Sequence, residues 1–136
     1  MKFMMIVKAT QESEAGVMPE MDLIEAMAKY NDELIKAGVL LDAAGLHPSS
    51  KGWRIQFTGN QRKVVDGPFP ETKELIAGYW LIEVKSPEEA LDWSKRIPNP
   101  YEQDGQVEVR RLFDETDFGP EAEERLRGRQ AAMKGT

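Results

Sequence analysis

The sequence predicts an α+β domain of the ferredoxin-like type, in which two helices cover one face of a largely antiparallel sheet. Segments of strand length alternate with two segments of helical periodicity, in the order β-α-β, β-hairpin, β-α-β. The 136 residues fit one domain, and no repeat or linker divides them. Because two helices cannot cover both faces of such a sheet, we expect the other face to pack against a second copy in a homodimer.

The first half of the chain begins with a predicted strand at residues 3–9, where apolar side chains occupy both parities. Residues 11–16 are polar and predict a loop. A helix is predicted over residues 19–37, because apolar residues recur there at helical spacing. Pro19 suits the first helical turn, and Gly38 suits the position after the last turn.

The middle of the chain predicts a second strand at residues 39–46 and a hairpin formed by residues 53–58 and 63–65. Gly59-Asn60 is a tight-turn signal. Apolar and polar residues alternate along the first hairpin strand, which indicates one buried face. Residues 76–84 are almost wholly apolar and predict a central strand. The candidates for covering the open sheet face in the dimer are Met4, Ile6, Trp53 and Ile55.

Ser86-Pro87-Glu88-Glu89 predicts a helix start, with Ser86 as cap, Pro87 in the first turn and Glu89 completing a capping box. This helix runs to about Arg96 and buries Ala90, Leu91 and Trp93. Residues 106–112 predict the last strand, and residues 121–133 predict a charged helical tail. We therefore divide the chain into a domain at 1–114 and a C-terminal tail at 115–136.

Composition excludes several classes of function. The net charge of −6 and the pI of about 4.9 disfavour nucleic acids and anionic membrane surfaces as partners. With no cysteine and a single histidine, the sequence offers no disulfide, thiol nucleophile or zinc site, and no metal or cofactor is expected. The apolar N-terminal run is too short for a signal peptide or a membrane span, so we expect a cytoplasmic protein.

The most specific motif is Asp66-Gly67-Pro68-Phe69, termed here the DGPF loop, which is followed by Glu71-Thr72-Lys73-Glu74 and Gly78-Tyr79-Trp80. Together with Lys2-Phe3-Met4, Gly45-Leu46-His47-Pro48-Ser49 and Val107-Glu108-Val109-Arg110, it resembles the YCII-related proteins, in the branch that carries a DGPF motif. The resemblance covers about residues 1–114. It implies a dimeric α+β barrel that holds a small organic ligand.

Relatives in this superfamily include isomerases and monooxygenases, while YCII-related proteins are mostly without an established reaction. Shorter members carry a histidine near the start of the first helix, proposed to work with an aspartate. Here that region reads Met18-Pro19-Glu20-Met21-Asp22, so this pair does not transfer.

The candidate catalytic residues are His47 and Asp66. His47 is the single histidine, and an imidazole is the usual proton carrier near neutral pH. Asp66 either caps the DGPF loop or presents its carboxylate to a ligand. Gly67 is expected to supply a positive φ angle.

The candidate ligand-binding residues are Arg54, Phe69, Lys73 and Tyr79. Each also has a purely structural explanation. Arg54 can be a solvated strand residue, and Phe69 can fill the core. Lys73 can form a surface ion pair with Glu74, and Tyr79 can be a strand residue whose hydroxyl needs a partner. We expect Trp80 in the core and Tyr79 on the opposite face.

Two functions remain open from the sequence. In the first, a cytoplasmic homodimer binds a small organic molecule in a cleft near the DGPF loop and carries out general acid-base chemistry through His47 and Asp66. In the alternative, the chain is a non-enzymatic ligand-sensing or protein-interaction module, and the DGPF loop is structural.

Overall fold

The computed structural model describes residues 1–101 and 103–134 of the chain. Its elements are β1 Lys2–Lys8, α1 Gln11–Glu14, α2 Met21–Lys36, β2 Leu40–Gly45, the 3₁₀ turn η1 Ser49–Lys51, β3 Trp53–Thr58, β4 Gln61–Asp66, the 3₁₀ turn η2 Thr72–Glu74, β5 Ile76–Glu83, α3 Pro87–Lys95, β6 Val107–Arg111, the 3₁₀ turn η3 Glu115–Phe118 and α4 Pro120–Lys134.

The main sheet has four strands in the order β2-β5-β1-β6, and every neighbouring pair is antiparallel. With α2 between β1 and β2, and α3 between β5 and β6, this topology is compatible with a ferredoxin-like fold. The predicted α+β class and antiparallel sheet are therefore confirmed. The register pairs Met5 with Trp80 on one side and with Val109 on the other.

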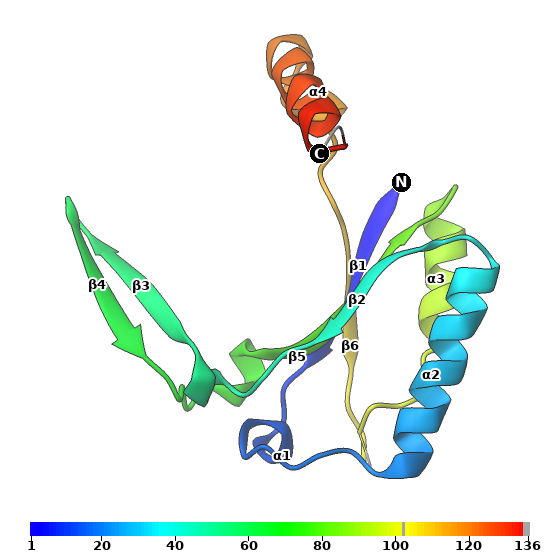
Figure 1. Ribbon diagram of the computed structural model, residues 1–136, viewed down its shortest axis with the longest axis vertical. Coiled ribbons are helices and arrows are strands. Elements are labelled where there is room, and N and C mark those ends of the chain that lie inside the picture. Colours follow the sequence, from blue (N-terminus) through cyan, green and yellow to red (C-terminus); the bar gives the residue numbers. More distant parts are fainter. Residues whose placement is uncertain (102, 135–136) are drawn as a thin grey trace.

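Both α2 and α3 lie on the same face of this sheet, as Figure 1 shows. The core between these two helices and the sheet is formed by Phe3, Met5, Tyr30, Leu34, Val39, Trp80, Ile82, Val84, Ala90 and Trp93. Tyr30 joins the two helices, since its hydroxyl donates to the Trp93 carbonyl at 2.7 Å. Its ring also meets Trp80 edge-on, with the ring centroids 5.4 Å apart. Trp80 is in the core as predicted.

The hairpin of β3 and β4 forms a separate two-stranded sheet. It stands away from the open face of the main sheet, on the side opposite to α2 and α3 (Figure 1). Its turn at Gly59-Asn60 is confirmed, with Gly59 at φ 60°. The predicted burial of one hairpin face is wrong for the single chain, because all six residues of β3 are exposed.

Several element ends differ from the predictions. Helix α2 begins at Met21, so Pro19 precedes it, and Gly38 follows its end with φ 74° as expected. Ser86 caps α3 by accepting from Glu89 N–H, but the Glu89 carboxylate accepts from Lys85 N–H, so the box is not completed as predicted. Leu91, expected to be buried, is exposed.

The segment before α2 is not simply a loop. Residues 11–14 form the single-turn helix α1, which Thr10 and Ser13 cap reciprocally: Ser13 N–H donates to Thr10 Oγ1, and Thr10 N–H donates to Ser13 Oγ. This short-range pair stabilises a turn that apolar periodicity cannot reveal.

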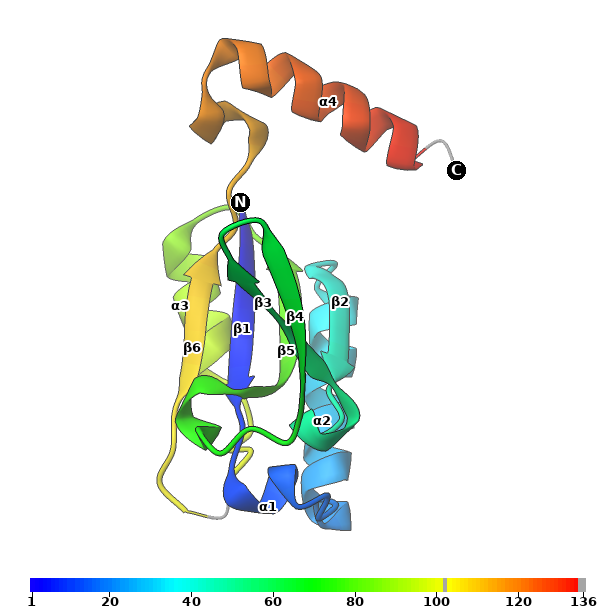
Figure 2. The same cartoon turned by 90° about the vertical axis from the view of Figure 1, so that its left-hand side faces the viewer.

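The predicted helical tail is present as α4. It lies beyond the end of the main sheet and packs against η3 (Figure 2). Arg127 forms ion pairs with Glu115 and Glu123, and the rings of Phe113 and Phe118 meet with centroids 5.1 Å apart. Among the described residues, no helix is long and apolar enough to cross a membrane.

Candidate functional site

The backbone of the DGPF loop lies directly against η1. Gly67 N–H donates to the Gly52 carbonyl, and Phe69 N–H donates to Ser49 Oγ, both at 3.0 Å. A Cβ atom on Gly67 would lie only 1.8 Å from the Ser49 carbonyl oxygen. Gly67 has no positive φ, so the expected backbone reason is wrong. Glycine is required here because two backbone segments approach too closely for a side chain.

Ser49 also connects this loop to α1. The Glu14 carboxylate accepts from Ser49 N–H at 2.9 Å and from the Ser49 hydroxyl, which in turn accepts from Phe69 N–H. Three segments far apart in sequence are thus held by one serine and one carboxylate, a set we term the Glu14–Ser49 joint. Sequence reasoning missed both residues, because neither belongs to the DGPF motif and the capped turn before Glu14 has no apolar pattern.

Arg54 and Phe69, two of the predicted ligand-binding residues, contact each other. The Arg54 guanidinium carbon lies 3.8 Å from the Phe69 ring centroid, and its Nη1 lies 3.9 Å from Glu71 Oε2. A guanidinium over a ring at this distance makes a favourable cation–π contact. In the single chain, therefore, Arg54 and Phe69 bind each other at the base of the hairpin.

Tyr79 lies on the open face of the main sheet, opposite to Trp80 as expected. Its hydroxyl donates to Asp42 Oδ2 at 2.8 Å, which supplies the partner that the sequence could not identify. This hydrogen bond to Asp42 is the largest cause of a raised pKa for the Tyr79 hydroxyl. Because the hydroxyl donates its one proton to Asp42, the group that it offers to another molecule on this face is an acceptor oxygen.

His47 and Asp66 are both exposed in the single chain. Within the described residues, neither side chain has a hydrogen bond or ion pair, and neither lines either of the two hollows described below. The expectation that Asp66 caps the DGPF loop through its side chain is therefore wrong. The two segments that carry them nevertheless meet, since Gly67, next to Asp66, packs on Ser49.

A hollow of about 660 Å³ lies at the end of β1, and Lys73 of η2 forms part of its wall. We term it the Lys73 hollow. Four segments of the chain line it: residues 8–12, Lys73, Tyr101 and residues 103–106. Its volume falls within the range of small-molecule sites, which is about 300–1,000 Å³.

The charged groups at the Lys73 hollow are of both signs. Lys8 and Lys73 supply ammonium groups, and Glu12 and Asp104 supply carboxylates. The Lys8 ammonium lies 3.9 Å from a carboxylate oxygen of Glu108, while Lys73 makes no ion pair among the described residues. This lining is polar rather than apolar. It offers a polar molecule hydrogen bonds and the ammonium group of Lys73.

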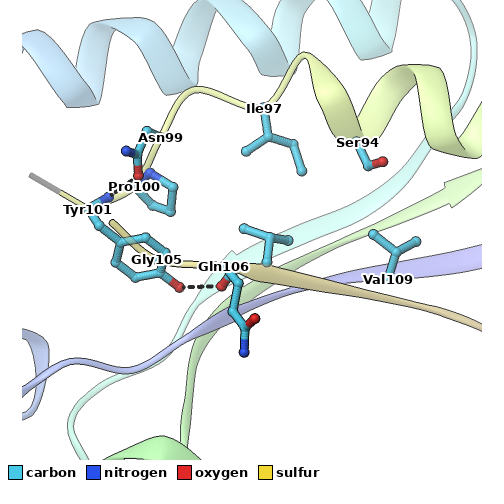
Figure 3. Close-up of a pocket in the computed structure, with 9 residues that line it drawn as sticks. Ser94, Ile97, Asn99, Pro100, Tyr101, Gly105, Gln106 and Val109 are labelled. Atoms are coloured by element: carbon cyan, nitrogen blue, oxygen red, sulfur yellow. Dashed lines mark hydrogen bonds between the residues drawn. The ribbon is translucent and has the colours of Figure 1, made fainter. Parts of the chain in front are cut away.

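Tyr101 separates this hollow from a smaller one of about 260 Å³ between α3 and β6. Figure 3 shows Ile97 and Val109 facing this smaller hollow and the Tyr101 hydroxyl bonded to the Gln106 carbonyl, at 2.9 Å. The hydroxyl also accepts from Lys8 N–H at 3.0 Å. Burial raises the pKa of the Tyr101 hydroxyl, and the bond from Lys8 opposes the shift.

Tyr101 was not among the predicted residues. It follows Pro98-Asn99-Pro100, which signals only that a helix has ended. Among the described residues, no group of three or more histidine and acidic side chains is placed to hold a metal ion.

The fold and this lining define a small α+β domain with a polar hollow at one end of its sheet. Residues 1–116 match the YCII-related domain, and the chain belongs to that family. The chain is also similar to an uncharacterised protein of Rhizobium meliloti (strain 1021), with 33% identity over 103 residues, which cover 76% of this chain and 78% of the relative.

Proposed function

We propose that this protein is a ligand-binding module of the DGPF branch of the YCII-related family, and that the Lys73 hollow takes a small polar molecule with an acidic group. One observation carries the proposal: Lys73, a cation with no acidic partner among the described residues, lines a hollow of about 660 Å³. Lys73 follows the DGPF loop in the sequence. Carboxylates at the same hollow favour a ligand that also carries an amino group or hydroxyl donors.

The structural role of the DGPF loop supports this proposal over acid-base chemistry. Gly67 N–H bonds the Gly52 carbonyl, and Phe69 N–H bonds Ser49 of the Glu14–Ser49 joint. The segment that carries Lys73 is tied to the end of β1, where Ala9 N–H donates to the Leu75 carbonyl. In this proposal the loop positions the hollow and does not itself react. The exposed side chains of His47 and Asp66 stand outside it.

The test uses a thermal-shift screen with small carboxylates and free amino acids. A ligand that binds only the folded protein raises the melting temperature. We expect at least one such compound to do so, and we expect Lys73→Gln to abolish the shift. Lys29→Gln, which removes the same charge from an exposed position of α2, is the matched control and should keep it. An equal shift in both variants would exclude Lys73 from the site.

Acid-base chemistry by His47 and Asp66 is the second candidate, and the packing of Gly67 against Ser49 favours it because it brings the two segments together. Such chemistry requires the bound molecule to contact both side chains. Proton NMR of the His47 ring tests this directly. A ring signal that moves when a compound from the screen is added supports this candidate, and a signal that stays in place removes it.

We further propose that the protein is a homodimer. Met4 and Ile6 alternate along β1 with the core residues Phe3 and Met5, and Met4 pairs with Leu81. These three partly buried side chains therefore lie on the face that α2 and α3 do not cover. Burying such apolar area contributes about 25 cal/mol per Å². A second copy of the sheet is the simplest cover for this face, and a barrel-like dimer would follow from it.

A further inference from the structure

The β3–β4 hairpin carries a row of apolar side chains that stay largely exposed in the described chain, although the Arg62 guanidinium lies 4.7 Å from the centroid of the Phe57 ring. Trp53 and Phe57 are each 65% exposed, Val64 is 60% exposed and Ile55 is 42% exposed. The register pairs Ile55 with Val64 and places Trp53 and Phe57 on the same face. We term these four side chains the hairpin row.

The DGPF loop does not cover this row, because it contacts the opposite face of the hairpin. Arg54 pairs with Val65 on that opposite face, and the Arg54 guanidinium lies over the Phe69 ring. Figure 1 shows the hairpin standing away from the main sheet, so the sheet does not cover it either. A two-stranded hairpin alone is marginally stable in water, and packing on another surface is what normally stabilises it.

Charge restricts what that surface is. Residues 53–66, which form the hairpin, contain three basic side chains and one acidic side chain, a formal charge of +2. The whole chain has a formal charge of −6, which leaves −8 on the rest. A basic hairpin on an acidic body is complementary to a second copy of that body, and complementary charge favours their association.

The available area points to the same partner. Two aromatic rings that are two-thirds exposed offer on the order of 250 Å², whereas a stable interface buries about 800 Å² per partner. The hairpin row is therefore too small to hold a partner alone. The open sheet face must lie in the same interface, and a second copy presents both surfaces at once.

We propose that the β3–β4 hairpin is a dimerisation arm, which packs its hairpin row against the second copy while the open sheet faces pack together. This inference rests on the proposed homodimer and adds to it the segment and the face that make the contact. The row is exposed in the single chain because its partner surface belongs to the other chain.

The test compares the self-association of Phe57→Glu with that of Gln56→Glu by sedimentation at several protein concentrations. Gln56 is the neighbouring residue of β3 and lies on the opposite hairpin face, so the two variants add the same charge to the two faces. We expect Phe57→Glu to raise the dimer dissociation constant about 30-fold or more. We expect Gln56→Glu to dimerise as the wild type does.

The outcomes separate the two proposals. A wild type that stays monomeric at high concentration overturns both the dimer and the arm. A dimer that is unaffected by Phe57→Glu overturns the arm alone and leaves the sheet-to-sheet dimer standing. Equal weakening by both variants also overturns the arm, because the effect would then not depend on the apolar face.

Amide hydrogen exchange in the wild type provides a measurement that needs no folded variant. If the arm packs on a second copy, exchange of the amides in residues 53–66 slows as the protein concentration passes through the dimer dissociation constant. Exchange in α2, on the other face of the sheet, serves as the internal reference. Hairpin exchange that does not depend on concentration contradicts the proposal.

Discussion

Gly67 is limited by the space around it. A Cβ atom there would meet the Ser49 carbonyl oxygen at 1.8 Å, and that oxygen belongs to the backbone. Relief requires one of two chain segments to move, which breaks the hydrogen bonds that join the DGPF loop to η1. The motif is thus explained at this position by packing.

We predict that Gly67→Ala destabilises the fold by about 2–4 kcal/mol, in line with strongly overpacked sites. The matched control is Gly52→Ala, where the nearest atom to an added Cβ is at 3.8 Å and φ is not positive. It should change stability by less than about 1 kcal/mol. Urea unfolding of both variants measures the difference, and equal midpoints would show that the DGPF loop adapts freely.

Asp66 differs from its neighbour, because its exposed side chain makes no hydrogen bond or ion pair within the described chain. Substitution to alanine at such positions changes stability by about 0.5 kcal/mol or less. We therefore expect Asp66→Ala to unfold at nearly the wild-type temperature. A large loss would indicate that its carboxylate makes a contact in the dimer.

At the scale of elements, the Glu14–Ser49 joint holds α1, η1 and the DGPF loop together. Removing the Ser49 hydroxyl leaves Phe69 N–H and the Glu14 carboxylate without that partner. Hydrogen bonds to a charged group contribute about 1.5–3 kcal/mol. The joint should therefore behave as one unit.

A double-mutant cycle tests this unit. We predict that Ser49→Ala costs about 1–2 kcal/mol. Glu14→Ala should cost less in that background than alone, since only the bond from Ser49 N–H then remains, and the coupling should be at least about 0.5 kcal/mol. Ser50→Ala, at the exposed neighbouring position, is the control for Ser49. Additive losses from Ser49→Ala and Glu14→Ala would show that the two side chains act independently.

Tyr30 connects α2 to α3, and burial raises its pKa from 10.0 to about 12. Because the folded protein holds the proton more tightly than the unfolded chain, this contribution is complete below pH 10 and is lost as the pH rises to 12. We predict that Tyr30→Phe removes this part of the alkaline destabilisation. At neutral pH it costs about 1–2 kcal/mol, because the Trp93 carbonyl loses its donor. Melting curves between pH 8 and 12 check both effects.

Local sequence predicted some elements well and others poorly, for physical reasons. Strands β1 and β5, and helix α2, were predictable because a buried face gives a regular apolar period. The same reasoning located the hairpin strand Trp53–Thr58 but wrongly gave it a buried face, since its alternation indicates an apolar face without indicating which chain covers it. Helix α1 was not predicted, because its stability comes from the reciprocal caps of Thr10 and Ser13 and not from an apolar period.

At the scale of the whole molecule, the four-stranded sheet leaves one face without helices, and the hairpin stands on that side (Figure 2). Light scattering at micromolar concentration should give twice the chain mass of 15.4 kDa. The mass of one chain would mean that the open face is stable in water.

The site was less predictable than the fold. Lys73 was chosen because it follows the DGPF motif, and it lines the larger of the two hollows described above. Lys8, Tyr101 and Gln106 come from two distant segments, and only the path of the folded chain brings them together. Arg54 and Phe69 were chosen as ligand-binding residues, yet in the single chain they make a cation–π contact with each other.

Binding at the Lys73 hollow is tested most directly by mapping amide shifts in nitrogen-15 NMR spectra. The probe is the carboxylate or amino acid that most raises the melting temperature. Shifts should concentrate at Thr10, Lys73 and residues 103–106, which line the hollow. Shifts concentrated at His47 and Asp66 instead, or the lack of any saturable shift with the whole panel, would show that this hollow is not the binding site.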